Sequence, residues 1–279
     1  MSFYEMYTKL QDFWVKKGAT AVLPYNLCVG AATFHPKCFF SVLKSTKEAY
    51  VHIQKSTRKA DGRYGKSPNR LLNHHQLQVI FNPAPKNIKE LFLESLESLG
   101  IDLNENFIQF NDNNWENISI GAIGIGWDVL CNNTEICQYT YFQKMADIEL
   151  SSNAVELAYG IERLMFVLNK KSVFDCDFSS STSYYHEFFE IEKQFSEYYF
   201  NFNKDSKDDF FLLKSEIIEL ISSNLYLPAY DLLIKMIDIF NSLDAKKEIS
   251  LIQRKEYINT TRMIANQIAN NYLQKKSIV

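Results

Sequence analysis

The sequence lacks long apolar runs and a secretion signal. No stretch reaches the roughly 18 consecutive apolar residues needed to cross a bilayer. The amino terminus, MSFYEMYTKLQDFW, has no charged segment followed by an apolar one, as a signal peptide would. We therefore expect a soluble, cytoplasmic protein without membrane association.

Cysteine is scarce, and neither sign of charge is in large excess. The five cysteines are widely spread and never form a C-x-x-C pair, which argues against a disulfide framework and a zinc finger. The 30 Lys and Arg residues against 33 Asp and Glu residues give a formal charge of −3. This near balance excludes a protein that coats nucleic acid mainly through bulk phosphate attraction. Local basic patches remain compatible with it.

What is present is an ordinary globular composition. Of the 279 residues, 46% are hydrophobic and 23% are charged, which is enough for a sizeable core. At roughly 100–200 residues per domain, the chain holds one large domain or one domain with a smaller addition.

Helical and strand patterns alternate through the first part of the chain. Apolar spacing predicts helices over residues 4–17, ended by Gly18, over 87–101, between Asn87 as N-cap and Gly100 as terminator, and over 153–169. Short β-branched and aromatic patterns predict strands over 20–24, 49–53, 76–81, 107–115, 126–133 and 134–143. The Asn132-Asn133 pair predicts a tight hairpin turn between the last two.

A Ser-rich stretch at residues 175–183 separates this part from a tail, 184–277, that is helical in pattern almost throughout. We place a domain boundary there. Strands in antiparallel pairs, flanked by helices, define an α+β fold.

The loop between strands 49–53 and 76–81 is basic. Its cations surround Gly62 and Gly65 and are Lys55, Arg58, Lys59, Arg63, Lys66 and Arg70. Arginine offers planar bidentate donors and glycine lets the backbone approach closely, so the loop suits a phosphate ligand. On composition alone, a solvated surface loop is the alternative.

Arg163 is expected near the middle of the predicted helix 153–169, among apolar neighbours. A cation there needs a ligand or a partner, and a structural Arg–Glu pair is the alternative to a ligand. Other chemical motifs fail their tests. GAIGIGWDV precedes a strand pattern instead of a helix, so it is no dinucleotide fingerprint. His74 and His75 point to opposite faces of a strand, without an acidic or Cys partner at metal-ligand spacing.

No G-x-S-x-G elbow and no P-loop is present. Any chemistry must therefore rest on positioning and charge.

Several longer strings carry a resemblance to a known family. In chain order they are GAATFHP (30–36), DGRYGxxPNR (61–70), QxQV (76–79), NWEN (114–117), GWDV (126–129), YGIERL (159–164) and LPAYD (227–231). Together they resemble the α subunits of bacterial glycyl-tRNA synthetases over nearly the whole chain.

The resemblance implies a class II aminoacyl-tRNA synthetase. Residues 1–178 would form its catalytic core, an antiparallel sheet flanked by helices with three sequence motifs, and residues 184–279 a helical C-terminal domain. Motif 1, residues 4–24, would form a homodimer interface. Motif 2, Tyr50 to Phe81, would hold the α-phosphate of ATP and the 3′ end of tRNA, and motif 3, Gly160 to Arg163, would hold the γ-phosphate.

The implied activity is that of a glycine–tRNA ligase. The glycine carboxylate attacks the α-phosphorus of ATP, and glycyl-adenylate then passes glycine to the 3′ end of tRNA(Gly). ATP and Mg²⁺ are the implied small molecules. The implied partners are a separate β subunit, in a tetramer of two α and two β chains, and the acceptor end of tRNA.

The resemblance also implies roles for single residues. Arg58 and Arg163 would be catalytic and would bind ATP. Further ATP-binding candidates are Arg63, Arg70, Gln76, Gln78, Glu135 and Gln138, of which Glu135 is also the candidate metal ligand. Glycine-binding candidates are Thr33, Trp115 and Glu156, with Glu156 expected to bind the ammonium group.

One departure bears on the activity. The family usually reads P-S-R-R-P where this chain has Lys55-Ser56-Thr57-Arg58-Lys59. Thr57 cannot replace an arginine as phosphate ligand, so Arg58 or Lys59 would have to shift to cover that charge. Thr57 favours a first alternative, a catalytically weakened homologue acting as a dimeric scaffold. A second alternative is an amino-acid–adenylate ligase with an acceptor other than tRNA, because such enzymes share the same motifs.

Overall fold

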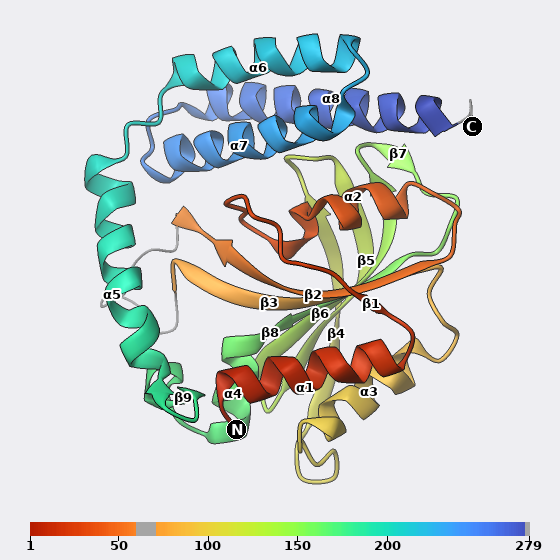
Figure 1. The fold of residues 1–279 in the computed structure, drawn as a ribbon, viewed down its shortest axis with the longest axis vertical. Helices are drawn as coiled ribbons and strands as arrows, with labels where there is room; N and C mark the ends of the chain where they lie inside the picture. The colour runs from red at the N-terminus through yellow and green to blue at the C-terminus, as the bar shows by residue number, and fades with distance from the viewer. Residues whose placement is uncertain (60–70, 277–279) are drawn as a thin grey trace.

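One large sheet forms the centre of the molecule, with helices on both of its faces (Figure 1). The computed structural model describes residues 1–59 and 71–276. In the described ranges, no helix is long and apolar enough to cross a membrane. The five cysteines are free thiols, as their spacing predicted.

The sheet has eight strands, seven of them in the order β1-β2-β3-β8-β6-β5-β4, with β7 paired to β6. Their bounds are β1 Thr20–Ala21, β2 Glu48–Thr57, β3 Asn73–Asn82, β4 Ile108–Asn117, β5 Ala122–Cys131, β6 Thr134–Met145, β7 Ile148–Glu149 and β8 Val155–Gly160. All neighbours pair antiparallel except β1 and β2, which are parallel. The predicted antiparallel sheet is thus confirmed apart from β1, which makes it mixed. A separate hairpin joins β9 Asp177–Ser179 and β10 Thr182–Ser183.

The helices are grouped by the sheet face that they cover. Helices α1 Phe3–Lys16, α3 Ile88–Ser98 and α4 Ile161–Asn169 lie under one face. Helix α2 Pro36–Val42 and the layer of α6 Lys207–Ser222, α7 Tyr226–Ala245 and α8 Leu251–Lys276 lie over the other (Figure 1). Helix α5 Tyr184–Glu197 runs along the side of the molecule between the two layers. Short turns are the 3₁₀ segments Ala32–Phe34 and Val173–Asp175 and the π-helical turn Tyr198–Phe202.

Local signals explain several of these elements. Ser2 and Glu5 form a capping box at the start of α1, and Gly18, with φ of 99°, follows its end. Asn132 and Asn133 both have positive φ, 49° and 66°, between β5 and β6. They form the hairpin turn that their sequence predicted. Strands β2 and β3 are longer than predicted, and β1 is shorter.

The predicted helix over residues 153–169 is wrong in its first half. Val155–Gly160 is strand β8, and only Ile161–Asn169 is helical. β8 pairs with β3 on one side and β6 on the other, and Val155 to Tyr159 are buried throughout. A central strand buried on both faces has no polar alternation, so local apolar spacing cannot distinguish it from a helix.

Two apolar clusters fill the space on either side of the sheet. One joins α1, α3 and α4 to residues such as Leu77, Val79 and Leu157. The other joins α2, α7 and α8 to residues such as Ile80 and Phe142. The helical region after residue 184 therefore shares a core with the sheet, and its description as a separate domain stays a prediction.

Candidate active site

The face of the sheet toward α2 and α7 is rich in polar side chains. Strand β3 shows why: Leu77, Val79 and Phe81 belong to the apolar cluster under α1, while the alternate positions Gln76 and Gln78 point the other way. Residues paired directly across strands lie on the same face. The row through Gln78 therefore collects polar groups on this face, and its members are His52, Gln78, Ala158, Gln138, Asp128 and Asn111.

Glu156 lies one row further along, opposite Ile80 and Thr140, and is only 1% exposed. Its Oε1 accepts hydrogen bonds from Thr33 Oγ1, at 2.9 Å, and from Gln78 Nε2, and the Cys38 thiol is 3.9 Å away. Burial raises the pKa of Glu156 to about 7, although these donors oppose the shift. Within the described residues, Gln78 Oε1 is buried without a hydrogen-bond partner. The pair thus offers two oxygens to a cation.

Trp115 projects from β4 onto the same face. It stands opposite Gly124, and its ring meets that of Phe142 on β6 edge to face, with centroids 5.6 Å apart. Because Gly124 has no side chain, the indole reaches across β5 to β6, the neighbour of β8. The three glycine-binding candidates thus share one face, and two of them, Thr33 and Glu156, are in direct contact.

Arg163 is the third residue of α4, in its first turn and not near the middle of a helix, as its sequence context suggested. Its side chain is 51% exposed, and Nη1 lies 2.8 Å from Glu135 Oε2 and donates to Glu135 O at 3.2 Å. The Arg–Glu pair considered from the sequence is therefore formed, and its partner is another predicted ATP-site residue.

Asp128 is a candidate site residue that the sequence analysis missed. Burial, with the charge of Glu135 adding to it, raises the pKa of Asp128, while the hydrogen bond from Asn113 and the charge of Arg163 oppose this. Asp128 lies on the polar row of the sheet, in strand β5. The sequence signal that could have indicated it is its place in the string GWDV, two residues after Gly126. Asp128, Glu135 and Arg163 form one charged group.

This group supplies some, but not all, of the ligands that a magnesium ion needs. Mg²⁺ is usually held by one or two carboxylates together with substrate phosphates and water, and Glu135 and Asp128 supply two carboxylates beside a guanidinium. Over residues 1–59 and 71–276, no group of three or more His, Cys, Asp or Glu side chains is arranged to hold a metal alone. A metal here would need ligands from a bound substrate.

Arg58 follows the end of β2. Its Nε donates to Gly30 O at 3.3 Å, and its backbone N–H donates to Leu72 O at 2.7 Å. Burial lowers the pKa of the His74 imidazole to about 4, and the charges of Arg58 and Arg163 contribute to the shift. The charges of both predicted catalytic arginines therefore reach the same half-buried ring. His74 and His75 face opposite sides of β3, as predicted, and His75 pairs with Glu162 at 2.7 Å.

The remaining candidates have mixed outcomes. Gln76 Oε1 accepts from Ala32 N at 3.1 Å and Ser56 Oγ at 3.0 Å, so this oxygen holds the segment before α2 against the sheet. Gln138 is partly exposed on the polar row. Arg63 and Arg70 lie outside the described residues. The binding roles of all four stay predictions.

The side chains of the two residues that flank Arg58 both have partners within the protein. Thr57 Oγ1 donates to Asn73 Oδ1 at 2.8 Å. The suggestion that Lys59 covers the charge left by Thr57 is wrong, because its side chain is only 3% exposed and its ammonium lies 2.8 Å from Asp238 of α7. Of the two substitutes considered, only Arg58 is left.

Comparison with known proteins identifies the family of the chain. A model of the glycyl-tRNA synthetase alpha subunit family matches residues 3–277. The glycine–tRNA ligase alpha subunit of Coprothermobacter proteolyticus is 40% identical over 279 residues, which is 99% of this chain and 96% of the relative. The chain is therefore a class II aminoacyl-tRNA synthetase chain, an ATP-dependent ligase. It belongs to the glycyl-tRNA synthetase alpha subunit family.

Two solved structures are more distantly similar. One is the crystal structure of pyrrolysyl-tRNA synthetase from Desulfitobacterium hafniense, with 16% identity and a TM-score of 0.44 over 65% of this chain and 75% of that one. The other is a structure of PylSc, a pyrrolysyl-tRNA synthetase from the same organism, with 14% identity and a TM-score of 0.46 over 64% and 74%.

Proposed function

We propose that this chain activates glycine with ATP and transfers it to the 3′ end of tRNA(Gly), as the α subunit of a glycine–tRNA ligase that works with a separate β subunit. The observation that carries the residue assignment is the buried carboxylate of Glu156 beside the unpartnered Gln78 Oε1. A buried carboxylate is costly unless a cation or strong donors compensate it. The ammonium group of glycine supplies that cation.

Glu156, Gln78 and Thr33 thus form the ammonium site. Glycine has no side chain to grip, so selection depends on its charged groups and on walls that exclude a methyl group. Trp115 and Phe142, in contact on the same face, form one such wall. Cys38, close to Glu156 Oε1, adds bulk beside the carboxylate from the side of α2.

The first chemical step needs no general base. The glycine carboxylate is already a nucleophile, and it attacks the α-phosphorus of ATP while the bond to pyrophosphate breaks. Negative charge grows on the transferring phosphorus centre and on the leaving pyrophosphate. Arg58, at the end of β2, and Arg163, at the start of α4, stabilise this charge by position alone. Arg63, Arg70, Gln76 and Gln138 complete the ATP contacts.

Arg163 has to exchange partners when ATP binds. Its guanidinium is half exposed and is held by Glu135. The γ-phosphate, with more charge than one carboxylate, competes for it, and Glu135 with Asp128 is then free to hold Mg²⁺. A bound Mg²⁺ would offset phosphate charge.

The assembly that we propose is a cytoplasmic tetramer of two α and two β chains. Support for pairing of α chains through residues 4–24 comes from exposed apolar side chains there, of which Leu23 is 85% exposed and Tyr4 53%. The helical region after residue 184 is then left for the β subunit and for the acceptor end of tRNA.

The test is glycine-dependent exchange of labelled pyrophosphate into ATP, with and without the β subunit, and with alanine and serine as controls. Exchange with glycine alone establishes both adenylation and its specificity. Exchange without transfer to tRNA in the presence of β would favour an adenylate ligase with another acceptor. No exchange in either condition would reject the proposal and favour a scaffold homologue.

A further inference from the structure

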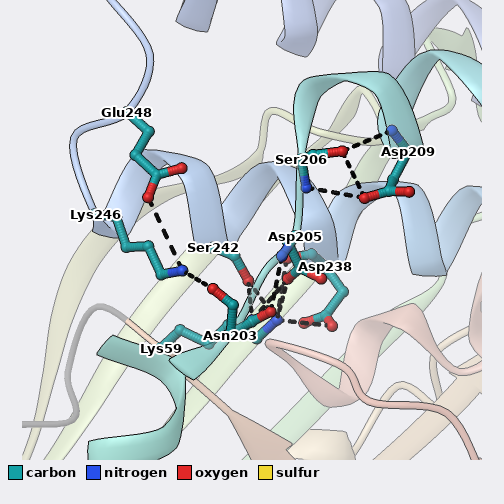
Figure 2. Close-up of polar contacts among 9 residues, drawn as sticks. All are labelled: Lys59, Asn203, Asp205, Ser206, Asp209, Asp238, Ser242, Lys246 and Glu248. Atoms are coloured by element: carbon teal, nitrogen blue, oxygen red, sulfur yellow. Dashed lines mark hydrogen bonds and ion pairs between the residues drawn. The ribbon is translucent and has the colours of Figure 1, made fainter. Parts of the chain in front are cut away.

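Lys59 lies in a buried polar cluster between the sheet and the helical region (Figure 2). Its Nζ donates to Ser242 Oγ at 2.6 Å and to Asp238 Oδ2 at 2.8 Å, both on α7. Asp205 Oδ2 is 3.5 Å away, and the ring of Tyr199 lies 4.7 Å from the ammonium. The end of β2 is therefore tied to three segments of the helical region.

The cluster is itself held in place. Asn203 Nδ2 donates to Asp205 Oδ2 at 2.8 Å and to Ser242 Oγ at 3.3 Å, and the Lys246 ammonium donates to Asn203 O (Figure 2). A cation so little exposed would be strongly destabilising if it were unpaired, so a buried Lys59 fixes its surroundings as well as itself.

A second buried charge binds the start of the returning strand. Glu192 on α5 is 2% exposed, and its two oxygens accept the backbone N–H groups of Leu72, at 2.7 Å, and Asn73, at 2.8 Å. Leu72 O in turn accepts the backbone N–H of Arg58 at 2.7 Å. Glu192 is therefore linked to Arg58 through the single peptide unit between Leu72 and Asn73. Lys59 follows Arg58 directly in the chain.

We propose that Lys59 and Glu192 are positioning residues of the ATP site, which clamp the ends of β2 and β3 to the helical region and so fix Arg58 for ATP. The inference rests on the proposed role of Arg58. Its consequence is that the helices after residue 184 control how the phosphates of ATP are held, although none of their residues is assigned to the reaction.

The test measures the Kd of ATP by calorimetry on the full chain, and the KM for ATP and for glycine in pyrophosphate exchange. We expect Lys59→Met to weaken ATP binding about tenfold, as is common for residues coupled by direct contact, and to leave the KM for glycine unchanged. Lys59→Arg, which keeps the charge, should restore most of the affinity. Glu192→Gln should act in the same direction as Lys59→Met, because an amide offers only one acceptor for two N–H groups.

Arg262→Met is the matched control. Arg262 also joins the helical region to the sheet by an ion pair, with Asp147, but at the turn between β6 and β7. It should leave the Kd of ATP unchanged. Circular dichroism melting shows whether each variant folds. If Lys59→Met does not fold, the Kd of ATP for Lys59→Arg and Glu192→Gln tests the inference instead.

The decisive comparison uses Arg58→Ala as background. If Lys59 acts through Arg58, Lys59→Met has no further effect on ATP binding there. An equal loss in both backgrounds, a loss no larger than that of Arg262→Met, or a parallel rise in the KM for glycine would overturn the inference, as would absence of ATP binding by the unaltered chain. Absence of glycine-dependent exchange with normal ATP binding would reject the proposed function alone.

Discussion

The hydroxyl of Thr33 donates to Oε1 of Glu156 at 2.9 Å, across 123 residues of sequence. This contact joins the segment before α2 to the central strand β8, at a carboxylate that the fold keeps from water. A buried charge is costly unless its partners compensate for the lost hydration, and one hydroxyl is a weak partner for a carboxylate. The contact therefore points to a ligand. We expect a change at Glu156 to affect function and stability in opposite directions.

Glu156→Gln should stabilise the fold and abolish glycine activation. The pKa of the carboxyl rises from 4.5 to about 7 on folding. The native state therefore binds more protons between these values, and stability falls as the pH rises from about 4.5 to about 7, then stays level. Above pH 7 the amide should recover on the order of 3 kcal/mol as an upper bound. Urea unfolding at pH 5 and pH 8 measures it.

Glu97→Gln is the control for that experiment, since it makes the same change of carboxylate to amide at an exposed position of α3. A Glu156→Gln variant that is less stable than the unaltered chain at pH 8 would show that the ionised carboxylate is structural.

Glycine use should fall in mild acid for the same reason. Below pH 7, Glu156 takes up a proton and can no longer pair with the ammonium group of glycine. At saturating ATP, kcat/KM for glycine should drop about tenfold for each pH unit below 7. Exchange rates between pH 5.5 and pH 8.5 measure this. A flat profile over that interval would exclude Glu156 as the ammonium ligand.

The sequence predicted some residues and elements of this site and not others. Strand and hairpin signals such as Asn132-Asn133 are local, and they fix the antiparallel β5–β6 pair. Helix α1 was equally clear, because its apolar spacing and the Gly18 that terminates it are both local signals. The family motifs then named Glu156, Arg58 and Arg163, which the structure places on one face of the sheet or at its edge.

Long-range partners were beyond such reasoning. Glu156 was assigned to a helix because β8 is buried on both faces, and only its pairing with β3 and β6 makes it a strand. From the sequence, Lys59 was interpreted as one more cation of a basic loop. Its partners Asp205 and Asp238 are 146 and 179 residues away in the chain, so no local pattern points to them. Burial of a charge depends on the whole fold, and no local pattern encodes it.

Gly126→Ala should be strongly destabilising. A Cβ at this position would lie 1.9 Å from Tyr139 O on the neighbouring strand, which forces β5 away from β6. We expect a loss of at least about 2 kcal/mol, in the range seen when well-packed sites are overfilled. Gly30→Ala is the control, because its nearest atom would be 3.8 Å away. Thermal melting of both variants measures the difference, and equal melting temperatures would contradict the close approach of the two strands.

Arg163→Ala should abolish adenylate formation and leave the chain folded. The guanidinium is half exposed and pairs with Glu135 at the surface, and such pairs contribute about 1 kcal/mol or less to stability. Loss of a phosphate-stabilising donor, by contrast, typically lowers kcat by a hundredfold or more. Arg254→Ala removes a comparable exposed pair, with Asp244, between helices α8 and α7, and should leave pyrophosphate exchange intact. Since both variants lose one surface ion pair, only the position of Arg163 beside Glu135 and Asp128 can separate their activities. An Arg163→Ala variant that melts much earlier than Arg254→Ala would instead assign this arginine a structural role.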